Sequence, residues 1–358
     1  MLRYGQKSGL SPLAASRYRI PNRNREAASP FESRLMTQSD TVEQSNDEPI
    51  ILRFDASHRR IDKKKSDEQT LGQFIPLIYH YNMLQDTDRV GGFRQAIELL
   101  VQPGMRVAEL GSGTGILSSF AARRGATVEA VERNPELVKC SRQLIQSNGL
   151  QKQIKVIAED ASLWIPTEPI DVVICEMLHV GLLREKQAQV ITAFKENYQK
   201  RFGNKLPIFI PEVSILMCQP VEQSFDFAGY VAPIPMFQAP VETQPRTKQV
   251  APLTAYQTIA YDQAIPTAMR VDQTYEANCD AVVNAIRLVT QNVLAIDMSK
   301  QHAITWANQC LVLPLDSAFS CRTGETVHLS LEYEAGQQIE SVRYSVSPMI
   351  RRMQSRAA

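Results

Sequence analysis

Between about residues 69 and 207, short apolar runs alternate with longer stretches of helical periodicity. The short runs are apolar at most positions, as in a parallel sheet covered on both faces, and they occupy residues 105–110, 127–131, 154–158 and 171–175. Segments of helical length, residues 115–124 and 135–148, lie between the first three runs. This alternation predicts a Rossmann-like α/β domain over residues 69–210, with a doubly wound and mostly parallel sheet.

The pattern changes after Pro211. Prolines gather between Pro220 and Pro252, helical periodicity fades, and apolar and polar positions alternate in runs such as residues 327–333. These features predict a second domain, residues 211–358, built as an antiparallel, β-barrel-like structure. The proline-rich stretch from about residue 226 to residue 255 is too long for a simple hairpin loop, so we expect an inserted arm there.

The start of the chain differs in composition from both predicted domains. Residues 1–36 carry seven Arg and Lys against two Glu, and residues 28–48 are rich in Ser, Asp, Glu and Gln. Few apolar positions are available there to form a core, which predicts a largely disordered N-terminal extension over residues 1–68. The Arg- and Ser-rich beginning is also compatible with a transit peptide, but a plain extension is the interpretation we prefer.

Composition and charge exclude several classes of protein. The longest apolar runs have strand length, far below the roughly 18 to 20 residues of a membrane span, so we expect no membrane association. The formal charge of +1, from 39 basic and 38 acidic residues, argues against nucleic acid as a partner bound through a global basic field. Six cysteines without a CxxC pair and five histidines without ligand spacing predict a cytoplasmic protein with no metal site.

A glycine-rich turn follows the first predicted strand. It reads Glu109-Leu-Gly111-Ser-Gly113-Thr-Gly115-Ile116, and its glycines permit a tight turn and a close approach of the backbone to a ligand. Ile116 stands where the dinucleotide fingerprint requires its third glycine. Glu109 would repel a phosphate but suits a cationic ligand, so the turn predicts a cation in place of a pyrophosphate.

Carboxylates also follow the other three strands. Glu132 comes 21 residues after Gly111, the separation at which a carboxylate reaches ribose hydroxyls. Glu159 and Asp160 follow the third strand, and Glu176 follows the fourth. Because open α/β sheets bind ligands at this edge, we expect an acidic rim there. S-adenosylmethionine, which combines a ribose with a positive sulfonium, is the cofactor that this rim suits.

Residues 105–132 resemble the cofactor half of class I S-adenosylmethionine-dependent methyltransferases, and the wider chain resembles the protein arginine methyltransferases as a divergent, bacterial-type relative. Residues 80–89 are similar to a helix of that family in which a histidine and an arginine grip the cofactor, the arginine through the methionyl carboxylate. The cofactor-binding residues that this reading implies are His80, Met83, Arg89, Glu109, Gly111, Gly113, Gly115, Glu132 and Asp160.

A second match is the segment from Glu176 to Glu185, which resembles the double-glutamate loop of the family, with Gly181 between the two acids. Two carboxylates that grip a guanidinium from different sides would fix its plane and leave one nitrogen free to attack a methyl group. The resemblance implies Glu176 and Glu185 as catalytic residues. His179, inside the loop, could reach the site as a base or a ring partner, or be held by the backbone.

Further matches lie toward the end of the chain. Residues 207–211 resemble the family's crossing into its β-barrel, and Thr305-Trp306 stands where the family has a Thr-His-Trp loop, which implies that both residues face the substrate. In relatives an arm of the barrel docks on a partner subunit, so the resemblance implies a homodimer. The departures, such as Thr305 in place of histidine and Cys175 before the first glutamate, lie mainly on the substrate side.

Three functions remain open on these grounds. The first is N-methylation of arginine guanidinium groups in proteins or peptides. The second is N- or O-methylation of a small molecule, such as free arginine or another amine, hydroxyl or acid. The third is a non-catalytic scaffold that binds the cofactor weakly. The intact glycine turn and the presence of both glutamates speak against the third function.

Overall fold

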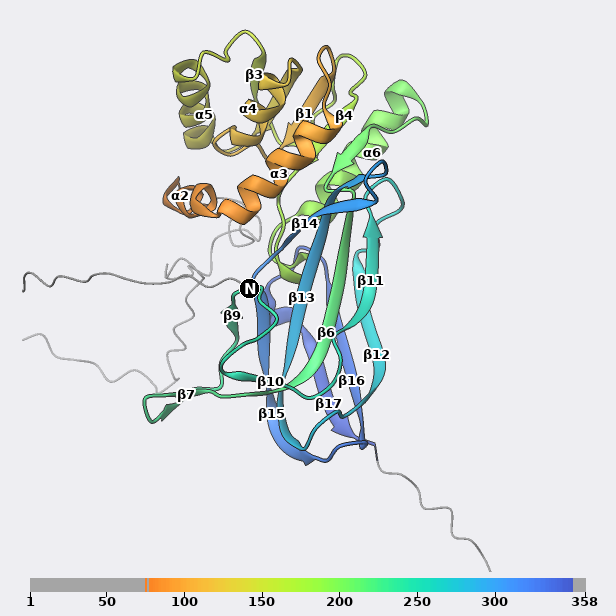
Figure 1. The fold of residues 1–358 in the computed structure, drawn as a ribbon. Coiled ribbons are helices and arrows are strands. Elements are labelled where there is room, and N and C mark those ends of the chain that lie inside the picture. Colours follow the sequence, from red (N-terminus) through yellow and green to blue (C-terminus); the bar gives the residue numbers. More distant parts are fainter. Residues whose placement is uncertain (1–74, 76, 350–358) are drawn as a thin grey trace, which may run out of the picture. The chain divides into compact units, whose positions relative to one another are not determined.

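The computed structural model describes residue 75 and residues 77–349 of the chain (Figure 1). The predicted N-terminal extension, residues 1–68, therefore lies outside the described residues. Within residues 77–349, no helix is both long and apolar enough to cross a membrane.

The first part of the described chain forms a five-stranded parallel sheet. Its strands are β1 (Arg106–Leu110), β2 (Thr127–Glu132), β3 (Ile154–Ala158), β4 (Val172–Cys175) and β5 (Ile208–Ile210). They are ordered β3-β2-β1-β4-β5, so the chain changes direction across the sheet between β3 and β4. Every residue of β4 is buried, as the apolar run predicts for a covered strand. The predicted α/β fold is confirmed, and a crevice is expected beside β1 and β4.

Helices connect these strands and cover the sheet (Figure 1). They are α2 (Leu77–Gln85), α3 (Thr87–Leu100), α4 (Ile116–Arg123), α5 (Pro135–Ser147) and α6 (Gln187–Phe202). α5 begins where its sequence favours a start, because the Asn134 side chain accepts a hydrogen bond from the Glu136 amide at 3.0 Å and Pro135 occupies the first turn.

The segment that precedes β1 differs from the expectation of a single helix carrying both His80 and Arg89. The helix breaks at Asp86, whose side chain accepts a hydrogen bond from the Arg89 amide at 2.9 Å and thereby caps α3. His80 lies on α2 and Arg89 on α3. The expectation of one helix is wrong because Asp86 starts a new helix there.

The second part of the described chain is antiparallel. β6 (Val213–Gln223) begins soon after β5 and pairs with β13 (Ala281–Asp297), and the larger sheet follows the order β10-β6-β13-β15-β9. In this sheet β11 also pairs with β6, and β14 with β13, while a three-stranded sheet follows the order β12-β16-β17. The remaining bounds are β11 (Thr254–Ala260), β12 (Ala268–Glu276), β14 (His302–Ala307), β15 (Cys310–Cys321), β16 (Thr326–Glu334) and β17 (Arg343–Pro348).

The segment predicted as an arm contains only short strands. These are β7 (Asp226–Phe227), β8 (Tyr230–Val231), β9 (Met236–Gln238) and β10 (Thr247–Gln249). β7 and β8 pair with each other in a separate two-stranded sheet, whereas β9 and β10 pair with β15 and β6. In Figure 1 β7 lies at the far end of this excursion, away from the long strands.

Side chains join the parallel sheet to the antiparallel part. Lys195 on α6 donates hydrogen bonds to the carbonyl oxygens of Tyr261, at 2.8 Å, and Gln263. The rings of Phe93 on α3 and Trp306 on β14 lie 6.2 Å apart between centroids. One apolar cluster extends through both parts. Helices α3 and α6 are therefore held against the antiparallel part of the chain.

Candidate active site

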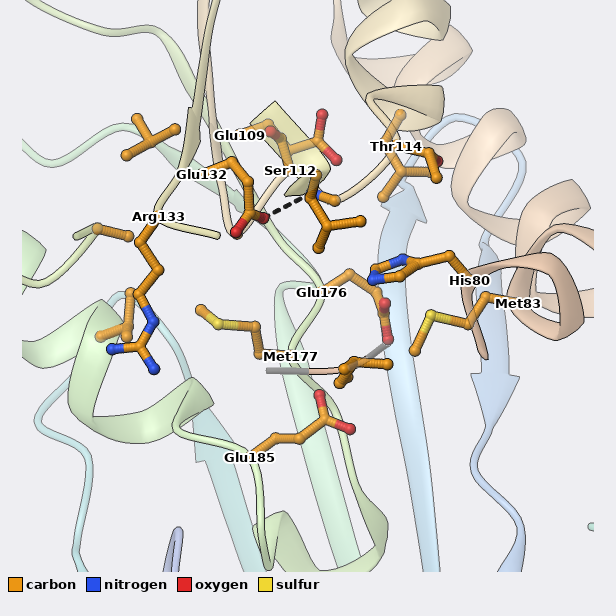
Figure 2. A pocket seen from close by; sticks show the side chains of 18 of the residues that line it. His80, Met83, Glu109, Ser112, Thr114, Glu132, Arg133, Glu176, Met177 and Glu185 are labelled. Carbon is orange, nitrogen blue, oxygen red and sulfur yellow. Dashed lines mark hydrogen bonds between the residues drawn. The ribbon is translucent and has the colours of Figure 1, made fainter. Parts of the chain in front are cut away.

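A cavity of about 380 Å³ lies beside the glycine-rich turn (Figure 2). Its lining contains most of the sequence-predicted residues, namely His80, Met83, Arg89, Glu109, Gly111, Gly113, Glu132, Asp160, Glu176 and Glu185. Gly115 does not line this cavity. It precedes α4 with φ of 80°, and a Cβ there would lie 3.4 Å from the Ile145 side chain, so its role is in the turn.

The two glycines that line the cavity let other side chains close over the turn. A Cβ on Gly113 would lie 2.9 Å from Cε1 of His80, and a Cβ on Gly111 would lie 3.0 Å from Sδ of Met177. Both glycines have positive φ, which disfavours other residue types. His80 and Met177 can therefore approach the backbone of the turn only because these positions are glycine.

Glu132 at the end of β2 is fixed by the backbone. Its Oε2 accepts a hydrogen bond from the Gly113 amide at 2.9 Å, and its Oε1 accepts one from the Asn134 amide at 2.8 Å. Each carboxylate oxygen has a further lone pair, so Glu132 can still accept hydroxyl hydrogens from a ligand. Figure 2 shows its carboxylate directed toward the space enclosed by the labelled side chains.

Arg133 is a residue of the cavity that the sequence did not single out. Its Nη1 lies 3.0 Å from Oδ2 of Asp160. Burial acts to raise the pKa of Asp160, but hydrogen bonds from Ser162 and Arg133 outweigh it and lower this pKa. Asp160 therefore carries a negative charge at neutral pH. The available signal for Arg133 was its position directly after Glu132.

Glu109 lines the cavity without supplying the negative charge expected of it. Its carboxyl group is buried and accepts hydrogen bonds from the Ser118 amide, at 2.7 Å, and from the Ser118 hydroxyl. Burial raises its pKa to about 8 in spite of these hydrogen bonds. Burial thus shifts Glu109 toward its protonated form, which differs from the charged carboxylate expected from the sequence.

The Arg89 guanidinium lies at the two glutamates of the loop after β4. Its Nη2 forms an ion pair with Oε2 of Glu176, and its Cζ lies 5.3 Å from the centroid of the Trp306 ring. Burial raises the pKa of Glu185, while the charges of Arg89 and Arg184 oppose that rise. Both carboxylates are thus close enough to act electrostatically on one guanidinium.

Hydrogen bonds hold this loop in place. The side chain of Gln187 is fully buried. It accepts a hydrogen bond from the Met177 amide at 2.9 Å and donates one to the Cys175 carbonyl at 2.8 Å, so it holds the backbone on both sides of Glu176. Gly181 donates its amide to Oγ1 of Thr290 at 2.8 Å. These supports were not predicted, because the contact between Gly181 and Thr290 joins residues far apart in the sequence.

A second cavity of about 1080 Å³ adjoins the first and shares Arg89 and Glu185 with it. It contains the three residues expected to face the substrate, His179, Thr305 and Trp306. His179 does not line the first cavity, and its Nδ1 lies 3.2 Å from the Val180 carbonyl oxygen. Burial lowers its pKa to about 4, so the ring is neutral at pH 7.

The first cavity fits S-adenosylmethionine. Within the described residues, four buried polar atoms of its lining have no hydrogen-bond partner in the protein, namely His80 Nε2, Ser112 Oγ, Glu176 Oε1 and Gln189 Oε1. Buried polar atoms are usually satisfied, so unpaired ones around a cavity point to a polar ligand. The volume of about 380 Å³ is within the range of small-molecule sites.

Comparison with known proteins agrees with this site. The profile of a family described as a methyltransferase domain matches residues 107–199. An uncharacterised protein of Methanocaldococcus jannaschii is 27% identical over 270 residues, which is 75% of this chain and 96% of that relative. An arginine N(omega)-methyltransferase of Streptomyces achromogenes subsp. streptozoticus is 33% identical over 134 residues, which is 36% of this chain and 37% of that enzyme.

Two solved structures share the fold. The crystal structure of PRMT6 superimposes with a TM-score of 0.59 and 15% identity, and the match covers 76% of this chain and 100% of that chain. The Trypanosoma brucei PRMT1 enzyme-prozyme complex with AdoHcy also gives a TM-score of 0.59, with 16% identity, over 76% of this chain and 97% of that chain. A parallel sheet followed by antiparallel sheets in this arrangement confirms the predicted two-part architecture.

The fold, the cavity at the glycine turn and the matching domain define a class I S-adenosylmethionine-dependent methyltransferase, with S-adenosylmethionine as its cofactor. Among such enzymes the chain is a divergent one that resembles the protein arginine methyltransferases.

Proposed function

We propose that the protein methylates a guanidinium nitrogen of arginine, held between Glu176 and Glu185. One observation carries this proposal. The Arg89 guanidinium forms an ion pair with Glu176 and acts electrostatically on Glu185, so one carboxylate already binds a group of the chemistry expected of the acceptor and the other lies near enough to interact with it. A carboxylate pair of this kind matches the planar, permanently charged guanidinium.

Different residues of the first cavity would bind different parts of the cofactor. Glu132 would accept the ribose hydroxyls, Arg89 would hold the methionyl carboxylate, and His80 and Met83 would cover the cofactor from α2. Nη2 of Arg89 donates a hydrogen bond to Glu176, and the other guanidinium nitrogens of Arg89 can still donate hydrogen bonds to the carboxylate of a ligand. When bound, S-adenosylmethionine supplies a methyl group on a positive sulfur, which an attacking nitrogen can accept.

The two glutamates would act by positioning. By holding positive charge on the guanidinium nitrogens that they touch, they leave the third nitrogen richer in electrons and aligned with the methyl group. The new N–C bond forms as the S–C bond breaks, and the nitrogen then loses a proton. One of the two glutamates would accept that proton, and the burial that raises the pKa of Glu185 favours Glu185 for this role.

Relatives with arginine-methylating names support this assignment, among them the Streptomyces enzyme and a protein arginine N-methyltransferase 6 of Xenopus laevis, 27% identical over 177 residues. A small-molecule acceptor is the second candidate. It is favoured by the mixed charge of the second cavity, which is lined by Asp86 and Asp88 and also by Arg184. A wholly acidic groove would suit Arg-rich peptides better.

The test uses labelled S-adenosylmethionine with the purified protein. Glu176→Gln and Glu185→Gln should each reduce transfer to a guanidinium by more than about 100-fold, because a guanidinium without its carboxylate is no longer oriented or polarised. Cofactor affinity, measured by calorimetry, should stay within a few fold. Glu196→Gln on α6, outside both cavities, is the matched control. Undiminished turnover in both active-site variants would contradict the assignment.

We further propose that the protein forms a homodimer through the arm at residues 226–255. Apolar side chains of the arm are exposed, among them Phe227, Tyr230, Val231 and Ile234. Surface patches of this kind in an excursion from the main sheets are typical of an interface. A second copy of the chain would cover them through a symmetric contact.

A further inference from the structure

Arg184 lies next to the proposed binding place of the acceptor guanidinium. It directly precedes Glu185 and lines the second cavity, and that cavity meets the first at Arg89 and Glu185. A guanidinium held at Glu185 would therefore have the rest of its molecule in the second cavity, beside Arg184. Phe237 and Trp306 line the same cavity and offer contacts to an aliphatic chain.

The backbone holds Arg184 in position. Its amide donates to the Gln337 carbonyl at 2.7 Å, and the Gly336 amide donates to the Leu182 carbonyl at 2.8 Å. These two hydrogen bonds tie the loop after β4 to the turn after β16. Arg184 has φ of 62°, a value that non-glycine residues adopt at a cost and that persists where the surroundings enforce it.

The Arg184 guanidinium has no directly bonded partner among the described residues. No carboxylate there lies within the 4.0 Å of an ion pair with it, and its side chain makes no hydrogen bond to them. The other arginine of the cavity, Arg89, is paired with Glu176. The charge of Arg184 reaches the site, because it opposes the rise in the pKa of Glu185 and contributes to the low pKa of His179.

A cation beside the binding place of a cationic acceptor is unfavourable unless the acceptor brings an anion of its own. Peptide groups on either side of an arginine within a polypeptide are neutral. A free amino acid carries a carboxylate, which the planar fork of an arginine matches, and an ammonium, for which Asp86 and Asp88 lie in the same cavity. Each charge of such a ligand has an opposite partner.

We propose that Arg184 binds a carboxylate of the methyl acceptor, and that the acceptor is accordingly a free amino acid with a guanidinium side chain. This inference rests on the proposed guanidinium methylation. It assigns Arg184 as a specificity-determining residue of the second cavity, at a position directly before the second glutamate of the loop.

The experiment compares three acceptors with labelled S-adenosylmethionine: free arginine, arginine amide, and a peptide with internal Arg-Gly repeats. For the wild-type protein, kcat/KM for arginine should exceed that for the amide by about 10- to 100-fold, the value of a charge-assisted hydrogen bond. Arg184→Gln should remove this preference by lowering kcat/KM for arginine alone, and Arg184→Lys should restore part of it. Arg94→Gln, on the exposed face of α3, is the control for loss of one positive charge.

The outcomes separate this inference from the function on which it rests. Methylation of arginine and its amide with equal efficiency, or a preference for the peptide, would overturn the carboxylate site and leave guanidinium methylation standing. Equal losses for both small acceptors in Arg184→Gln would also overturn it, since they would mean that the substitution disturbs Glu185. If no guanidinium compound is labelled, both proposals are wrong. Calorimetry with S-adenosylmethionine checks that each variant is folded and binds its cofactor.

Discussion

Glu109 shows how burial changes the meaning of a residue within a motif. A carboxylate before the glycine turn suggests a partner for a cation, but the group is enclosed, bound by Ser118 and close to Glu132. Its pKa of about 8 lies above the ordinary value of 4.5, so the folded state favours the protonated form. Asp160, whose pKa is lowered by hydrogen bonds from Ser162 and Arg133, keeps its negative charge in the rim. Which acidic residues stay charged could not be predicted without knowing their burial.

Glu109→Gln should change the pH dependence of stability. The raised pKa means that the contribution of this group is fully present below pH 4.5 and is lost as the pH rises to about 8. The unfolding free energy of the wild type should therefore fall, relative to that of the variant, by up to about 1.4 kcal/mol per pH unit as the pH rises over this interval. Urea unfolding at pH 5.5, 7 and 8 measures the difference. A difference that stays constant across these pH values would contradict a neutral Glu109.

His179 should give the opposite dependence. Its pKa of about 4 lies below the ordinary 6.5, so its contribution to stability is present above pH 6.5 and is lost as the pH falls toward 4. His179→Gln should flatten the decline of the unfolding free energy between these values, by up to about 1.4 kcal/mol per pH unit. His302→Gln, an exposed residue of the same cavity, is the control. The same decline in the wild type and in His179→Gln would show that the ring titrates normally.

At the scale of elements, Gln187 at the start of α6 binds the backbone of the loop after β4 on both sides of Glu176. Gln187→Leu should leave the Met177 amide and the Cys175 carbonyl without partners, at a cost of about 1–3 kcal/mol for each buried group. Glu176 lies between them, so we expect kcat to fall further than the loss of folded protein explains. Denaturant unfolding and methyl transfer with saturating cofactor measure the two effects.

The matched control for this loop is Gln199→Leu, the same change on the exposed side of α6. It should leave both stability and turnover nearly unchanged. If Gln187→Leu behaves like this control, the loop is held by its contacts with the antiparallel part of the chain, such as the hydrogen bond from Gly181 to Thr290, and Gln187 is dispensable.

Local patterns predicted the elements around the site well, because burial on both faces makes the strands of a parallel sheet apolar throughout. Each of the first four strands lies within about a residue of its apolar run. The break at Asp86 was missed although an aspartate is a common helix cap, since the resemblance to one long helix outweighed that signal. Gln187 could not be assigned, because a buried glutamine leaves no pattern in the sequence.

At the scale of the whole molecule, the sequence indicated an antiparallel second part but not how it supports the site. β13 pairs with β6, β14 and β15, and it carries Thr290, which receives the amide of Gly181. β13 is buried along most of its length, but nothing in its sequence pattern specifies its partners or its register. The register is what brings Thr290 to the loop of the two glutamates.

The proposed homodimer gives the prediction that belongs to the molecule as a whole. Tyr230 and Ile234 in the arm are 74% and 59% exposed, which costs free energy in water unless a partner covers them. The wild type should sediment at about twice the 40.2 kDa of one chain at micromolar concentration, and the double variant Tyr230→Ser, Ile234→Ser at the mass of one chain. Met298→Ser removes an equally exposed apolar side chain outside the arm and should leave the dimer intact. A wild-type protein that stays monomeric across the concentration range would disprove the interface, whereas a dimer that survives the double variant would place the contact on another surface.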